Sequence, residues 1–143
     1  MKKALVAALV LGATAGAHAG LINGGFEQLL PATLPVDGIT ITSAANVPGW
    51  KTTATDNQIE IWSTAFNGVS AYEGKQFAEL NANVAGNLYQ TFCLNGAGGS
   101  ISWAIKHRGR SGTDTAAVRF GPDLSTLTTV TTMTDGNTAW GSY

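Results

Sequence analysis

The sequence has little charge and no basic surplus. Only 12% of its 143 residues are charged, and eight Lys and Arg stand against nine Asp and Glu, a net charge of −1 at pH 7. Proteins that bind nucleic acid by neutralising phosphates are normally strongly basic, so the composition argues against a nucleic-acid partner. With 44% hydrophobic residues, the chain has enough apolar side chains for a core, and its length is that of one domain.

Cysteine and histidine are nearly absent. Cys93 is the only cysteine, which excludes an internal disulfide, and its neighbours Phe92 and Leu94 predict a buried core residue rather than a nucleophile. His107 is the only histidine after residue 18, and one Cys with one His argues against a zinc site. No H-E-x-x-H, G-x-S-x-G or phosphate-binding glycine loop is present. The sequence therefore favours a protein that is not an enzyme.

Long apolar runs are also missing, except at the N-terminus. Two lysines precede an apolar run over residues 4–11, and residues 17–19 have the small-x-small pattern that signal peptidase reads. The run is well short of the ~20 residues that a membrane-spanning helix needs. We predict that residues 1–19 are a signal peptide, with a buried helix as the alternative. Residues 20–143, net charge −3 once Lys2 and Lys3 are removed, would form one exported domain without a membrane-spanning segment, located outside the cell, at its surface or in the periplasm.

The exported part breaks into short runs separated by Gly, Asn, Asp and Pro, which is the spacing of an all-β sandwich. In residues 58–62, Ile59 and Ile61 lie on one face of the predicted strand, and Glu60 and Trp62 lie on the other. Eight threonines between residues 113 and 134 predict solvated strand faces. The predicted strands are residues 39–42, 58–62, 88–94, 100–106, 116–120 and 127–133, with a turn at residues 95–99.

Residues 74–86 fit two structures. Phe77, Leu80 and Val84 recur at helical spacing, whereas a strand would alternate Leu80 and its even-numbered neighbours against Phe77 and Glu79. We predict a strand because of the resemblance described next. The chain also stops at Trp140-Gly141-Ser142-Tyr143, where a further strand begins, so we expect a sandwich that lacks its last strands.

Five short motifs, read in order, resemble exported galactose-binding-like jelly rolls, the carbohydrate-binding-module type of sandwich found in bacterial surface proteins and plant cell-wall proteins. The resemblance covers residues 23 to about 121. It implies a jelly-roll β-sandwich that binds glycans or cell-wall polysaccharide without catalysis. The motifs are Asn23-Gly24-Gly25-Phe26-Glu27, Val47-Pro48-Gly49-Trp50, Ile59-Glu60-Ile61-Trp62, Gly74-Lys75-Gln76-Phe77-Ala78-Glu79-Leu80-Asn81-Ala82 with Leu88-Tyr89-Gln90, and His107-Arg108-Gly109-Arg110-Ser111-Gly112-Thr113-Asp114.

The resemblance also implies a structural calcium site at the N-terminal motif, to which Asn23 and Glu27 can contribute oxygens. The Asp expected from a final strand is missing. The alternative is that Asn23 and Glu27 only fix a turn and a strand end.

An exposed Trp beside a carboxylate suits a sugar, because the ring stacks on C–H groups and the carboxylate accepts hydroxyl hydrogen bonds. Trp62 has this place if the Ile face is the core. Alternatively, a loop or the missing strands cover Trp62. Trp50 and Trp103 are interpreted as core residues. Arg108 and Arg110 can bind hydroxyls or a carboxylate, or Asp114 can pair with one of them to hold the loop. The candidate ligand-binding residues are Glu60, Trp62, Glu79, Asn81, Tyr89, His107, Arg108, Arg110 and Asp114.

Two functions stay open. The first is a secreted glycan-binding module, and the second is a structural or adhesive surface protein whose partner is another protein or the cell envelope. A glycosidase would need two carboxylates across the scissile bond. Glu60 and Glu79 are candidates for such a pair, but the sequence does not give their separation, and we do not predict that activity.

Overall fold

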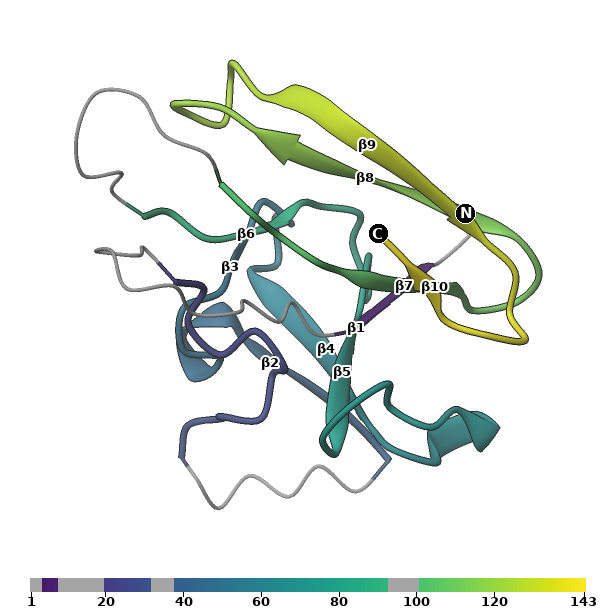
Figure 1. Cartoon of the computed structure of the whole chain (residues 1–143). Helices are drawn as coiled ribbons and strands as arrows, with labels where there is room; N and C mark the ends of the chain where they lie inside the picture. The colour runs from purple at the N-terminus through teal and green to yellow at the C-terminus, as the bar shows by residue number, and fades with distance from the viewer. Residues whose placement is uncertain (1–3, 8–19, 32–37, 93–100) are drawn as a thin grey trace.

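The computed structural model describes residues 4–7, 20–31, 38–92 and 101–143 (Figure 1). Nearly all regular structure in these residues is β, in ten strands and two 3₁₀ turns, η1 (Ala44–Asn46) and η2 (Phe66–Gly68). The predicted all-β class is therefore confirmed, and the jelly-roll topology stays a prediction. Cys93 and the turn at residues 95–99 lie outside the described residues.

The described residues form three antiparallel sheets. The largest has six strands in the order β10-β7-β1-β5-β4-β2, and the others are the pairs β3–β6 and β8–β9. In Figure 1 the long β8–β9 hairpin runs beside β7 at the top of the molecule. The bounds are β1 (Ala4–Ala7), β2 (Ile39–Ser43), β3 (Lys51–Thr52), β4 (Gln58–Ser63), β5 (Gln76–Glu79), β6 (Leu88–Tyr89), β7 (Lys106–Gly109), β8 (Asp114–Phe120), β9 (Thr128–Asp135) and β10 (Gly141–Ser142).

Apolar clusters cover both faces of β4 and β5 in the six-stranded sheet. On one face, Ile59 and Ile61 of β4 and Ala78 of β5 pack with residues that include Phe26 and Val47. On the other face, Trp62 and Phe77 pack with Val69, Phe66, Ala71 and Trp140. Side chains alternate between the faces of a strand, and every residue from Ile59 to Trp62 is buried. Strands β4 and β5 are thus buried on both faces.

Most predicted strands are confirmed. Residues 39–42, 58–62, 116–120 and 127–133 correspond to β2, β4, β8 and β9. Residues 74–86 contain the strand β5 and not a helix. Thr115, Thr132 and Thr134 of the Thr-rich hairpin are exposed, as predicted, while Met133 between the last two is buried.

Two strand predictions differ from the structure. The strand expected over residues 100–106 is wrong, because β7 begins at Lys106 and runs through His107 and Arg108 into the expected loop. Its pairing with β1 and β10 sets these bounds, and tertiary pairing overrides the alternation of Ile101, Trp103 and Ile105. Of residues 88–92, only Leu88–Tyr89 is strand.

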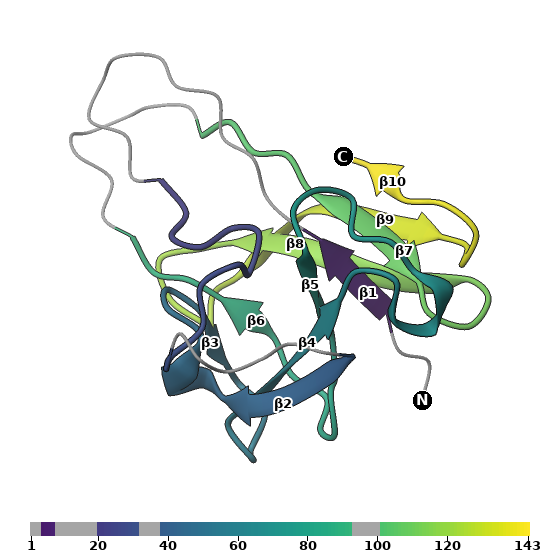
Figure 2. The same cartoon turned by 90° about the horizontal axis from the view of Figure 1, so that it is seen from below.

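The segment Ala4–Ala7 lies inside the six-stranded sheet, where Figure 2 shows it beside β5 and β7. The sequence predicts that residues 1–19 lie outside the fold, and for these four residues the structure differs. The reason is that a short uncharged apolar run suits a central strand as well as an export signal. Cleavage after Ala19 stays a prediction.

Candidate functional site

Four of the predicted ligand-binding residues meet on one face of the large sheet. Glu60 of β4 and Glu79 of β5 are direct cross-strand neighbours, and both are 2% exposed. Trp62 Nε1 donates to Glu60 Oε1 over 2.6 Å, and Arg110 Nη1 lies 3.0 Å from Glu79 Oε1. The Arg110 guanidinium also lies 4.8 Å from the centroid of the Trp62 ring. One oxygen of each of these two adjacent buried carboxylates thus has a partner, an indole N–H for Glu60 and a cation for Glu79.

The interpretation of Trp62 as an exposed ring is wrong. Trp62 is 1% exposed, because Phe66 meets its ring edge-on at 4.8 Å and Phe77 lies at 5.8 Å between centroids. These aromatic contacts, together with Arg110, occupy the surface on which a sugar would stack. The structure therefore agrees with the alternative prediction, in which Trp62 is covered.

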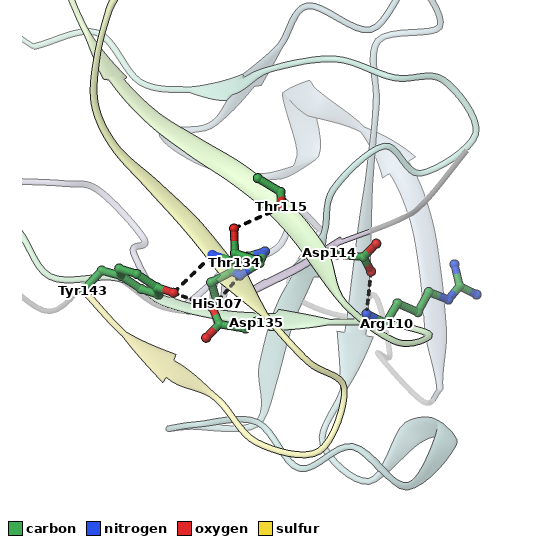
Figure 3. A network of polar contacts seen from close by, with 7 residues as sticks. All are labelled: His107, Arg110, Asp114, Thr115, Thr134, Asp135 and Tyr143. Carbon is green, nitrogen blue, oxygen red and sulfur yellow. Dashed lines mark hydrogen bonds and ion pairs between the residues drawn. The ribbon is translucent and has the colours of Figure 1, made fainter.

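A second polar cluster joins β7, β9 and the C-terminal residues (Figure 3). The carboxylate of Asp135 lies 2.7 Å from His107 Nδ1 and accepts a 3.0 Å hydrogen bond from the Tyr143 hydroxyl. That hydroxyl accepts from the Thr134 backbone N–H at 3.2 Å. Partial desolvation, and then the hydrogen bond to Asp135, raises the pKa of Tyr143 above its usual value. Because the imidazole of His107 is completely buried, it has no surface on which to meet a ligand directly.

The loop between β7 and β8 is held by Asp114, and Arg108 of β7 binds the segment that follows β9. Asp114 Oδ2 accepts a 2.9 Å hydrogen bond from the backbone N–H of Arg110, and Arg108 Nη2 donates to the Asn137 carbonyl. Gly112 has a φ of +94°, which glycine adopts at no steric cost. The structure therefore contains the loop-holding alternative, in which Asp114 binds the Arg110 backbone rather than its guanidinium.

The side chains of Asn23 and Glu27 also form hydrogen bonds with backbone groups. Asn23 exchanges two 2.9 Å hydrogen bonds with the backbone of Gln28. Glu27 Oε1 accepts from the N–H groups of Lys75 and Gln76 at 2.7 and 2.9 Å. These contacts agree with the alternative in which Asn23 and Glu27 only fix a turn and a strand end. Among the described residues, no group of three or more His, Cys, Asp or Glu side chains can hold a metal ion, and calcium stays a prediction.

The Glu27 contacts give a prediction that separates these two alternatives. Glu27→Ala should destabilise the fold by about 1–2 kcal/mol, because two backbone donors lose their acceptor. Glu27→Gln keeps an amide oxygen at that place and should cost less than half as much. Urea unfolding with calcium or with chelator measures both variants. If the wild type gains stability with calcium and Glu27→Gln loses that gain, Glu27 is a calcium ligand.

Asn81 and Tyr89 do not take part in the contacts that join Glu60, Trp62, Glu79 and Arg110. Asn81 Oδ1 accepts from the Gly86 N–H at 3.3 Å, and Asn81 and Glu79 line a cavity of about 20 Å³, enough for one water. Tyr89 of β6 is opposite Lys51 of β3. The predicted ligand-binding residues therefore do not form one surface.

An open depression of about 350 Å³ lies beside Trp50, on the segment that leads into β3. Trp50 stacks on Phe26 with 4.7 Å between ring centroids, and its Nε1 donates to the Asn23 carbonyl at 2.8 Å. These contacts fix the indole while leaving it half-buried at the depression. The other lining residues are Ala44, Ala45, Val47, Pro48, Gly49, Lys51 and Asn57.

Sequence reasoning missed this depression because it interpreted Trp50 as core. The available signal was a polar pair, Lys51 at the start of β3 and Asn57 directly before β4. Asp135 and Tyr143 were also missed, since neither belongs to a recognisable motif.

A scan against protein-family models, a search of curated proteins and a search of solved structures found no match to this chain. The resemblance to galactose-binding-like domains therefore stays a prediction from the five motifs. The part of the chain that the structure describes contains no helix with the length and hydropathy to cross a bilayer.

Proposed function

We propose that the chain is an exported, non-catalytic module that binds a glycan or cell-wall polysaccharide. The observation that carries the proposal is the fixed indole of Trp50 at the edge of an open depression. An aromatic ring with its orientation set by other contacts offers a stacking surface for sugar C–H groups. Lys51 and Asn57 line the same depression, and their side chains carry hydrogen-bond donors that suit hydroxyl groups.

The state of the two candidate carboxylates supports a non-catalytic role. Glu60 and Glu79 are adjacent, buried, and bound to Trp62 and Arg110. A glycosidase needs its two carboxyl groups about 5–9 Å apart across an accessible sugar, and this pair does not meet an open surface.

The test is a titration of the full chain with a panel of soluble glycans, followed by Trp fluorescence and calorimetry. Lys51→Met with Asn57→Gly removes both polar groups while tolerating the positive φ of residue 57, which is +53°. We expect one glycan class to bind the wild type and to lose ten-fold or more of its affinity in this double variant. The matched control is Lys75→Met, an exposed lysine outside the depression. Binding that survives the double variant, or a panel without any binder, would overturn the proposal.

A structural or adhesive role is the second candidate. The observation that favours it is the outermost position of β2 in the large sheet, with Ile39 42% and Ile41 39% exposed. An apolar edge strand is a template for pairing with another protein. A chain that binds no glycan but self-associates or binds envelope protein through β2 would support this role.

A further inference from the structure

We infer that the depression beside Trp50, the Trp50 depression, selects acidic glycans, in which the sugar ring carries a negatively charged group. The inference rests on the proposed function, since it names the class of glycan that the same site takes. Among the described residues that line the depression, Lys51 is the only charged one, and none is Asp or Glu. The site therefore presents one positive charge beside an indole and no lining carboxylate that would repel an anion.

The charge of Lys51 is not neutralised within the described part of the chain. Lys51 is exposed, and it takes part in neither of the two ion pairs found there. Asp56 is the acidic residue closest to Asn57 in the sequence, but it is half-buried and its Oδ1 accepts a 3.1 Å hydrogen bond from the Gln58 N–H. A ligand anion can therefore approach Lys51 without displacing one of these carboxylates.

Backbone contacts fix the three residues that would hold the sugar. The N–H of Trp50 and both backbone groups of Asn57 form hydrogen bonds of 3.0 Å with other backbone groups. Lys51 is paired with Tyr89 between β3 and β6. Binding then costs less conformational entropy, because only the ends of the side chains have to become ordered.

A sugar ring with a negatively charged group suits this arrangement. Phe26 stacks on Trp50, so a ligand can contact only the part of the indole that borders the depression. The C–H groups of the sugar pack on that part, while its charged group meets the Lys51 ammonium, a compact point charge on a flexible stem. The volume of about 350 Å³ is at the lower end for ligand pockets, so the depression takes a short stretch of a polysaccharide.

The expected preference for charge is modest because Lys51 is exposed. An ion pair between exposed groups strengthens binding by about two- to five-fold, and salt screens it. The whole chain has a net charge of −1 at pH 7, so its overall field does not attract anions. A preference for acidic glycans therefore has to come from the local charge of Lys51.

The experiment is a calorimetric titration of the full chain with short oligomers of galacturonic acid and with the same oligomers after methyl esterification. The ester keeps the C–H groups of the sugar but carries no charge. We expect the acid to bind about three-fold tighter than the ester at low salt. At about 1 M salt, where the Debye length falls to about 3 Å, the two should bind equally.

Sulfated galactose oligomers, with unsulfated ones as their neutral counterpart, provide a second source of negative charge. Tighter binding of either acidic oligomer than of its neutral counterpart supports the inference. The acidic oligomer with the larger preference identifies the anionic group as carboxylate or sulfate.

Variants of Lys51 test the origin of the preference. The readout is the ratio of the two affinities, because a fraction of unfolded protein lowers both equally. Lys51→Met should bring this ratio to about one, Lys51→Arg should preserve it, and Lys51→Glu should reverse it so that the ester binds tighter. The matched control is Lys75→Met, an exposed lysine outside the depression, which should leave the ratio unchanged.

The possible failures are distinguishable from a failure of the proposed function. If acid and ester bind the wild type equally and both are lost when Lys51→Met and Asn57→Gly are combined, the inference is wrong and the proposed function stands. A preference that survives in Lys51→Met also contradicts the inference, because the anion then meets another cation. If no acidic oligomer binds, the inference fails, and the neutral glycans of the wider panel decide the proposed function. A glutamic acid oligomer that binds as tightly as the acidic sugar would refute both, since the site then selects charge without a sugar ring.

Discussion

Trp62→Ala should lower the free energy of unfolding by about 3–5 kcal/mol, the range for removing a buried large aromatic side chain. Trp62 is among the largest fully buried side chains of the described residues, and it packs against Phe66 and Phe77. The substitution also removes the indole N–H that Glu60 accepts over 2.6 Å, and a buried acceptor without its donor adds to the loss. Urea unfolding followed by far-UV circular dichroism measures the change.

Trp62→Phe separates the two contributions. It keeps most of the apolar volume but removes the N–H, so we expect a smaller cost of about 2 kcal/mol. Leu124→Ala, at an exposed apolar position, is the control and should change stability by less than about 0.5 kcal/mol. If Trp62→Ala lowers the free energy of unfolding no more than the control does, Trp62 is not a buried residue and is again a candidate for stacking on a sugar.

Strand β4 illustrates what the sequence could predict. The alternation of Ile59 and Ile61 with Glu60 and Trp62 located the strand and its two faces correctly. It did not reveal that the polar face is also covered, because the covering groups are Phe66 in the turn after the strand and residues further along the chain. Phe77 is fifteen residues further on, and Trp140 joins the same cluster from near the C-terminus. Periodicity reports which residues share a face, and only tertiary packing decides whether that face meets water.

The polar clusters were only partly predictable for the same reason. The dense group around His107, Arg108, Arg110 and Asp114 was visible as a motif, and the structure does place these residues around β7. Their partners were not visible. Asp135 lies 28 residues from His107, at the end of a Thr-rich strand that shows no sign of a buried charge. A motif can therefore identify polar residues that matter without revealing whether they bind a ligand or one another.

The five motifs of the resemblance meet in part around the N-terminal segment. The Asn23 carbonyl accepts from Trp50, Glu27 accepts from the backbone after Gly74, and Gln90 bonds both backbone groups of Ile22. A Cβ atom on Gly74, whose φ is +65°, would collide with the Glu27 carboxylate. Several of these residue identities thus have a structural explanation, which is why the motifs indicate a fold more strongly than a ligand.

Arg110→Met should destabilise the protein by about 2–3 kcal/mol. The Glu79 side chain is fully buried, and Arg110 supplies its guanidinium over 3.0 Å. Breaking a buried ion pair by removing one partner costs about 3–5 kcal/mol, because a charge is left in the interior. The Arg110 side chain is 31% exposed, and solvent screening places the expected value at or below the lower end of that range. Met keeps an apolar side chain over the Trp62 ring, so the loss of stability measures the contribution of the Arg110 charge.

Glu79→Gln in the Arg110→Met background provides the decisive comparison. Removing the buried carboxylate charge should recover at least half of the loss, whereas two unrelated sites would give additive costs. Arg119→Met, an exposed arginine on β8, is the matched control and should change stability by less than about 0.5 kcal/mol. If Arg110→Met leaves stability unchanged but abolishes binding of an acidic glycan, Arg110 acts as a ligand residue and the interior ion pair contributes little. If it costs stability and the Glu79→Gln variant restores it, the cation belongs to the core, and the ligand must be sought at the Trp50 depression.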